Sequence, residues 1–491
     1  MIESVIFFFS GSGVVMLFIL FMRINVVGSK SKLVKHRSKE PGFVDLLIYA
    51  SVVDEGVIVG KDGSLMAAWA YQGVDSNSST EAERDQVSLQ INHALSRMGS
   101  GWMIHIDAVR KPAPGYSTKD DSHFPDPVSA AIDEERREFF ERVGTLYESN
   151  YVITATYLPP LLAQQKFVEL MFDDEGVPVD SKTRTIALLN HFKRECANIE
   201  SHLSSVFRMK RLKGKTITKE DNSSVNYDAF LRWIQFCISG LDHPVILPKN
   251  PIYLDALLSG QEFWGGVVPK IGQNFIQVVS IEGFPLASTP GLINSLADLP
   301  CLYRWSTRFI FMDTHEAVGH LEKFSKKWKQ KIRSFFDQVF NSHSSNVDQN
   351  AINMVSDAQA AIAETNSGEV AQGYYTSVVV LMSESRGDLE ASARQVAKAI
   401  NHLGFAARIE TINTIDAYLG SLPGHGVENV RRPLLNTMNL ADLMPSNTVW
   451  PGKNEAPCPM YPPMAPPLMH CTTQGATPFR LNLHVRDLGH T

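Results

Sequence analysis

The chain has 491 residues, more than one hydrophobic core usually organises, so two or three domains are expected. Hydrophobic residues make up 44% of the chain and charged residues 20%, which excludes a disordered or fibrous protein. The formal net charge of −6 gives no overall attraction to nucleic acid, so any contact with DNA requires a local basic patch.

The first 24 residues predict one transmembrane helix. Glu3 and Arg23 enclose a stretch without charge, long enough to cross a hydrocarbon core of roughly 30 Å at about 1.5 Å per residue. Residues 25–42 form a basic linker, and positive residues mark the cytoplasmic side, so we expect the bulk of the chain inside. The alternative is a buried hairpin or an amphipathic helix.

Residues 43–165 predict an N-terminal α/β subdomain. Two strands flank the Lys61–Gly63 turn, where Asp-Gly favours the backbone angles of a hairpin. Helices and strands then alternate, as expected for a sheet with packed helices. The predicted elements are strands Gly56–Gly60, Ser64–Tyr71, Trp102–Val109 and Tyr151–Tyr157, and helices Glu81–Met98 and Asp126–Glu148.

Residues 166–425 predict a second, α+β subdomain. His315–Phe340 has the clearest helical pattern, with apolar residues at three- and four-residue steps and lysines between them. Lys210–Ser224 is interpreted as a polar connection. The other elements are helices Thr183–Phe207, Tyr227–Ser239 and Leu389–Leu403, and strands Ile276–Ile281, Thr307–Met312, Tyr374–Met382 and Phe405–Thr411.

Residues 426–491 begin as a Pro-rich linker, because proline lacks the amide donor that helices and central strands require. A strand, Phe479–Val485, follows, and the sequence offers no sheet of its own to receive it. We therefore expect the last ~15 residues to be poorly packed, as termini without a docking partner usually are.

Three partial motifs fail as catalytic sites. Lys213–Thr216 lacks the first glycine of a phosphate-binding loop, and no apolar strand precedes it. His315 and His320 lie five residues apart, which places the two imidazoles on different sides of a helix. Asp133 and Glu134 are interpreted as first-turn residues of a helix. The five separated cysteines predict reduced thiols.

Several blocks in one order resemble the TrbE class of conjugal transfer ATPases, in the CagE/TrbE/VirB family. These blocks include Gly99–Trp102, Tyr157–Pro160, Val279–Pro285, Tyr303–Phe309, Ser421–Gly424, Asn429–Pro433, Thr437–Ala441 and Gly475–Arg480. The match runs from about residue 43 to the end of the chain. Several blocks in one order are far more specific than any single short motif.

The resemblance implies a type IV secretion subunit at the cytoplasmic face of the bacterial inner membrane. Its partners would be other inner-membrane subunits and further copies of itself. Family members use ATP and Mg²⁺ in a C-terminal RecA-like domain to drive pilus assembly and conjugal DNA transfer. We expect this chain to stop just before that domain's phosphate loop and to contain only its first strand.

No catalytic, cofactor-binding or metal-binding residue is therefore predicted, and the chain alone is expected to be inactive. The candidate interface residues are Arg304, Trp305, Arg308, Lys323 and Lys327. For the first three, the alternative is a structural strand with salt bridges; for the two lysines it is a solvated helix face. The alternative function is a free-standing membrane-anchored scaffold or DNA-handling protein without ATPase activity.

Overall fold

The computed structural model describes residues 42–73, 79–159, 179–218, 224–248, 252–285, 288–339, 349–428, 431–473 and 476–483. The chain divides into two units, residues 1–47 and 48–491, and the described residues of the first contain α2 (Phe43–Leu46). None of the helices among the described residues is both long and apolar enough to cross a membrane. The predicted transmembrane segment, residues 1–24, lies outside the described residues.

A 13-stranded sheet organises the second unit, and every strand pairing in it is antiparallel. Its main path is β1 (Tyr49–Asp54), β2 (Val57–Gly60), β3 (Leu65–Gln72), β5 (Tyr147–Tyr157), β4 (Trp102–Pro112), β13 (Tyr303–Phe311), β14 (Gln372–Ser383), β12 (Asn274–Gly283), β11 (Lys270–Ile271) and β10 (Phe263–Trp264). Three strands attach to this path: β6 (Arg208–Arg211) on β3, β15 (Ala406–Ile409) on β12 and β16 (Leu434–Asn436) on β14. The predicted mixed α and β class is confirmed, with a sheet larger than the local patterns indicated.

The pairing of β4 with β13 carries this sheet across the boundary predicted at residue 165. The paired residues run from Tyr303 opposite Arg110 to Ile310 opposite Met103. Strands from both predicted subdomains therefore share one hydrogen-bonded ladder.

One face of the sheet forms the hydrophobic core. Because opposed residues of antiparallel strands share a face, Trp69, Ile153, Ile106 and Trp305 lie together on it. Four helices cover this face: α3 (Glu81–Leu95), α6 (Val179–Leu203), α11 (Arg386–His402) and α13 (Thr437–Leu443).

The opposite face is polar at its centre, where Asp107, Arg304, Ser306 and Arg308 lie. The elements over this face are α7 (Ala229–Ser239), α8 (Leu254–Leu258), α12 (Thr414–Leu419) and residues 420–428. The Asp228 carboxylate begins α7 by accepting from two backbone amides, at 2.8 and 2.9 Å.

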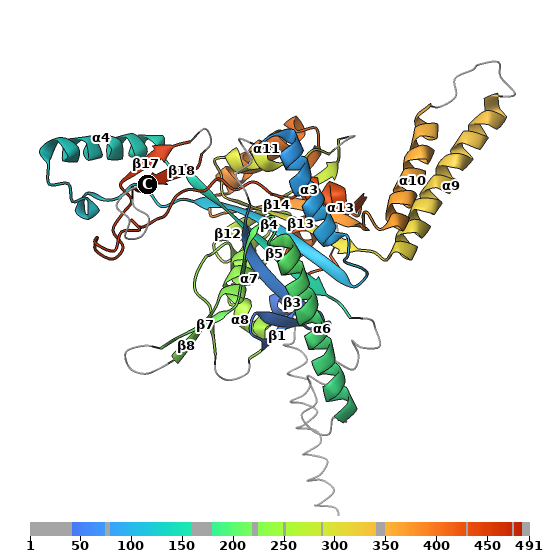
Figure 1. Cartoon of the computed structure of the whole chain (residues 1–491), viewed down its shortest axis with the longest axis horizontal. Coiled ribbons are helices and arrows are strands. Elements are labelled where there is room, and N and C mark those ends of the chain that lie inside the picture. Colours follow the sequence, from blue (N-terminus) through green and yellow to red (C-terminus); the bar gives the residue numbers. More distant parts are fainter. Residues whose placement is uncertain are drawn as a thin grey trace, which may run out of the picture. The chain divides into compact units, whose positions relative to one another are not determined.

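Helices α9 (Thr314–Val339) and α10 (Gln349–Ser367) lie side by side (Figure 1). The first matches the predicted helix within one residue at each end. The second was not predicted.

One predicted connection contains strands instead. Lys210–Ser224 was predicted to be a polar connection, yet it includes the end of β6 and all of β7 (Gly214–Thr218). β7 joins β8 (Ser224–Asp228) and β9 (Ile246–Leu247) in a small separate sheet. β7 is mainly polar and β9 has only two residues, so neither shows the apolar alternation that marks a half-buried strand.

The C-terminal segment also differs from the prediction. β18 (Pro478–Leu481) pairs with β17 (Met469–Thr472), so the terminal strand is received within the chain. The Arg480 side chain is buried and forms an ion pair with Glu148 on β5. The expectation that no sheet receives this strand was therefore wrong; residues 484–491 lie outside the described ranges.

Candidate functional site

Arg304, Trp305 and Arg308 lie on β13 and are buried, with 4%, 3% and 2% of their surface exposed. Trp305 faces the hydrophobic core, and its indole Nε1 donates to Ser377 Oγ at 2.7 Å. Arg304 and Arg308 face the polar side. None of these three predicted interface residues lies on the surface of the described chain, because neighbouring elements cover them.

Arg304 connects β13 to β4 and to the segment after α12. Its Nη1 donates to Asp107 Oδ1 at 2.9 Å and to the Ser421 carbonyl at 2.7 Å, and Nη2 donates to Ser421 Oγ at 2.6 Å. The Asp107 side chain is 0% exposed. The pair is thus an internal salt bridge between neighbouring strands, and the same guanidinium holds residue 421 against the sheet.

Arg308 holds the next stretch of the same segment. Its Nη1 donates to the carbonyl oxygens of His425 and Glu428, at 3.0 and 2.7 Å. His105 Nε2 lies 3.4 Å from the Gly420 carbonyl. Residues 420–428 are therefore anchored to β4 and β13 through their main-chain carbonyls.

Burial controls the ionisation of this network. It lowers the pKa of Arg308 to about 10, although Glu428 counteracts this effect, and it raises the pKa of Asp107 against the influence of Arg304. Burial also holds the pKa of His105 well below its usual value, with the Arg308 charge adding to the effect. The network therefore joins the sheet to residues 420–428 through side chains that are themselves buried.

Lys323 and Lys327 are exposed on α9. They lie one helical turn apart and therefore share a face. They are the two predicted interface residues that remain accessible to a partner, and their role stays a prediction.

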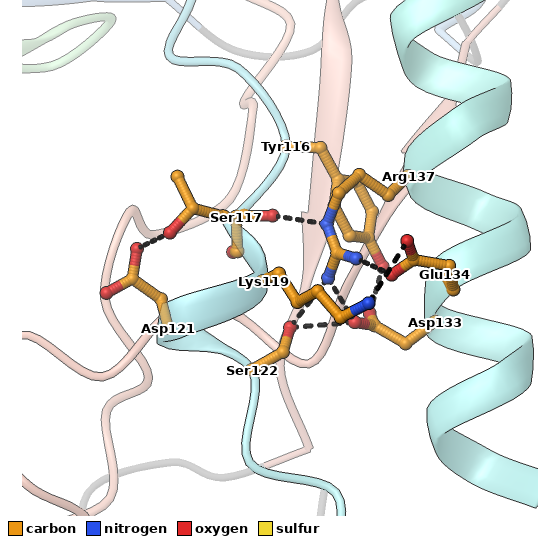
Figure 2. Close-up of polar contacts among 9 residues, drawn as sticks. Tyr116, Ser117, Lys119, Asp121, Ser122, Asp133, Glu134 and Arg137 are labelled. Atoms are coloured by element: carbon orange, nitrogen blue, oxygen red, sulfur yellow. Dashed lines mark hydrogen bonds and ion pairs between the residues drawn. The ribbon is translucent and has the colours of Figure 1, made fainter.

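A second polar cluster lies beside α4 (Pro127–Val143), and the sequence interpretation missed it. Figure 2 shows the Arg137 side chain reaching toward Asp133, Ser122 and the Ser117 carbonyl. Arg137 Nη2 donates to Asp133 Oδ2 at 2.6 Å and to Ser122 Oγ at 3.0 Å, and Nε donates to Ser117 O at 3.0 Å. The four-residue spacing of Asp133 and Arg137 was the sequence signal that could have revealed this pair.

Asp133 ties the preceding loop to α4. It accepts from the Tyr116 hydroxyl at 2.7 Å and from Ser122 Oγ at 2.7 Å. Burial and the hydrogen bond to Asp133 raise the pKa of Tyr116 to about 12. Asp133 and Glu134 lie beyond the first turn of α4, which corrects their predicted position at its N-terminus.

The cluster borders a hollow of about 350 Å³ that the Pro-rich segment closes on its other side. The loop that leads into α4 contains the short 3₁₀ helix η1 (Lys119–Asp121). Tyr116 and His470 line the hollow from opposite segments, with ring centroids 5.0 Å apart. Arg136 also donates to the His470 carbonyl. The Pro-rich segment is therefore docked against α4 here.

The sequence motifs that resembled catalytic sites are structural. Gly214, Lys215 and Thr216 lie within β7 rather than in a loop that precedes a helix, so they cannot wrap a phosphate. His320 Nε2 lies 3.9 Å from Glu316 Oε1 on α9. Among the described residues, no group of three or more His, Cys, Asp or Glu side chains could hold a metal ion.

Replacing His470 with phenylalanine is expected to reduce the loss of stability at mildly acidic pH. Burial, together with Arg480 and Arg136, lowers the pKa of His470 to about 4. The unfolded chain, with a histidine pKa of about 6.5, binds the proton first as the pH falls, so native stability decreases between about pH 6.5 and 4.

Urea unfolding midpoints at pH 7.5 and 5 measure this effect. His470→Phe keeps the ring packing against Phe140 and should show a smaller difference between the two midpoints than the parent chain. An equal difference in both chains would assign the acid sensitivity to other groups.

Two family models match the chain. The model for the N-terminal domain of the type IV secretion system ATPase VirB4/TrbE matches residues 56–165. The model for the CagE, TrbE, VirB family, a component of the type IV transporter system, matches residues 215–431. The second match includes β13 and α9.

Three curated relatives match the chain at 46%, 47% and 49% identity. The conjugal transfer protein TrbE of Rhizobium radiobacter is 46% identical over 458 residues, which cover 93% of this chain and 55% of the relative. Sinorhizobium fredii (strain NBRC 101917 / NGR234) has a probable conjugal transfer protein TrbE in two pieces. The second piece is 47% identical over 61% of this chain and 45% of its own length. The first piece is 49% identical over 26% of this chain and 84% of its own length.

The chain thus spans about half the length of the Rhizobium relative and of the second Sinorhizobium piece, and most of the first piece. The matches together extend over both predicted subdomains, which the sheet joins. The chain belongs to the CagE, TrbE, VirB family of type IV transporter system components.

Proposed function

We propose that this chain is the membrane-docking and assembly portion of a conjugative type IV secretion ATPase similar to TrbE. The observation that carries the proposal is the 46% identity to a conjugal transfer protein over 93% of this chain. In the whole protein, ATP hydrolysis with Mg²⁺ would drive pilus biogenesis and conjugal DNA transfer. We assign neither ATP nor Mg²⁺ to a residue of this chain.

The fold supports an assembly role through its rigid frame and its exposed basic helix. The buried Arg304–Asp107 pair joins neighbouring strands of the sheet, and α9 follows β13 directly in the chain. Lys323 and Lys327 then present positive charge to a partner subunit of the inner-membrane complex. Docking of the chain at the inner membrane, with its bulk on the cytoplasmic side, belongs to the same proposal.

Conjugation from donors that lack the native gene and carry the whole protein in trans tests this role. Lys323→Glu combined with Lys327→Glu should lower the transfer frequency on the order of tenfold, because reversed charge repels an acidic partner surface. The matched control is Arg394→Glu combined with Lys398→Glu, which reverses two exposed charges one turn apart on α11. It should leave transfer unchanged.

Fractionation of the same donor cells gives a second readout. The parent protein should sediment with the inner membrane, and both variants should accumulate to the parent level. Normal transfer by the double variant would remove α9 from the proposed interface. Recovery of the parent protein in the soluble fraction would contradict membrane docking.

A further inference from the structure

A hollow of about 540 Å³ lies where β6 and β3 meet α7. Register places its floor on the polar face of the sheet, since Lys210 lies opposite Ala70 and Arg208 opposite Gln72. Arg211 belongs to the other face, where its guanidinium lies 4.5 Å from the ring centroid of Trp69. Alternation along β6 thus directs Arg208 and Lys210 to the hollow.

The lining carries an excess of positive charge. Its charged residues are Lys111, Arg208, Lys210, Arg232 and Asp242. Asp242 accepts from Lys111 at 2.8 Å and from Arg232 at 2.6 Å, so one carboxylate serves two cations. Within the residues that the structure describes, neither Arg208 nor Lys210 forms an ion pair. Both are exposed and available to an anion.

Aromatic and amide groups complete the lining. Trp233 and Phe236 lie one turn apart on α7 and stack with ring centroids 5.8 Å apart. Lys111 Nζ lies 5.6 Å from the Phe236 centroid. Gln72 and Asn150 contribute exposed side-chain amides, which can donate to and accept from a polar ring edge. Charge, aromatic surface and amides therefore meet in one hollow.

We propose that this hollow binds single-stranded nucleic acid. Arg208 and Lys210 contact backbone phosphates, and an unpaired base lies against Phe236 within reach of the amides. Proteins that bind single strands combine a positive groove with aromatic stacking surfaces in this way. The chain as a whole carries a charge of −6, so attraction to nucleic acid has to come from such a local patch.

The shape of the site favours a single strand over two other anionic partners. A duplex keeps its bases stacked inside, so it could not use the recessed aromatic and amide groups. A membrane presents its phosphates on a broad surface, whereas the aromatic groups here lie in a concave site.

Fluorescence anisotropy with a labelled oligothymidylate of about 12 nucleotides, in the site-size range of single-strand binders, tests the proposal on the full chain. Arg208→Ala combined with Lys210→Ala should weaken binding about tenfold or more. The plot of the logarithm of the binding constant against the logarithm of the salt concentration should also become less steep. Its slope should fall in magnitude by about 1.4, since each of the two lost phosphate contacts contributes ~0.7. Phe236→Leu should weaken binding about tenfold with the salt dependence unchanged.

The matched control is Arg394→Ala combined with Lys398→Ala, which removes an exposed arginine and lysine from α11. This control should bind like the parent chain. If the control loses as much affinity as Arg208→Ala combined with Lys210→Ala (the β6 variant), the proposal is overturned, because equal losses indicate non-specific charge attraction. Failure of the parent chain to bind the oligonucleotide would also overturn it.

Two further probes separate the competing ligands. Vesicles containing phosphatidylglycerol and a polyglutamate peptide are each offered to the parent chain and the β6 variant. One of these probes could bind more tightly than the oligonucleotide and lose that binding in the β6 variant. The hollow would then be a lipid-headgroup site or an acidic-peptide site instead. A duplex that binds as tightly as the single strand would exclude the base-stacking contribution.

Discussion

Arg304→Met is expected to destabilise the chain by about 3–5 kcal/mol, the usual cost of removing one partner from a buried ion pair. The substitution leaves the Asp107 carboxylate buried without its cation and removes two donors from Ser421. Since domains are stable by only about 5–15 kcal/mol, the variant should be close to unfolding at ambient temperature. Urea denaturation followed by circular dichroism measures the difference.

Two further variants make this result specific. Arg386→Met removes an arginine whose side chain is 64% exposed and paired with Glu390, so it should cost only about 0.3–0.5 kcal/mol. Adding Asp107→Asn to Arg304→Met removes the unpaired charge and should restore some of the lost stability. If Arg304→Met unfolds at the same urea concentration as Arg386→Met, the buried pair does not hold the sheet together.

Gly452→Ala is expected to release the β17–β18 hairpin from the rest of the chain. Gly452 has φ +81°, and a Cβ there would lie 2.2 Å from the Arg480 main-chain oxygen. Left-handed backbone costs an ordinary residue roughly 1–2 kcal/mol, and the clash adds to that cost because it involves main chain. Pro451 O accepts from Arg480 N at 2.8 Å, so any displacement also breaks this bond.

Hydrogen exchange should therefore speed up at least about tenfold in β17 and β18, since each 1.4 kcal/mol changes an equilibrium tenfold. The matched control is Gly368→Ala. Gly368 has φ +77° but nothing within 4 Å of the added Cβ, so it carries the backbone strain without the clash. Unchanged exchange in the hairpin of Gly452→Ala would show that the contact is dispensable.

Local patterns in the sequence predicted the individual elements where the signal was strong. The Lys61–Gly63 turn joins β2 and β3 as expected, because Asp-Gly adopts the hairpin geometry readily. The bounds of α9 agree with the helix that the apolar spacing predicted, to within one residue at each end. α4 ends at Val143, before the predicted Glu148, since Gly144 has φ +83° and closes the helix.

Long-range pairing could not be predicted in the same way. Arg304 and Asp107 are 197 residues apart, and neither carries a local signal for the other. Arginine is usually exposed, so a charged strand indicates a surface unless its buried partner is known. The basic hollow beside β6 was also missed, because Lys210 was assigned to a connection and not to a strand.

The pairing of β4 with β13 has a consequence for any split form of this chain. A break in the chain between β5 and β12 would give two fragments. β4 would become an unpaired edge strand of the first fragment, and β13 an unpaired edge strand of the second. Such edges recruit any available strand, which leads to aggregation. The two fragments should therefore require co-expression, and they should reconstitute one ladder by complementation across the break.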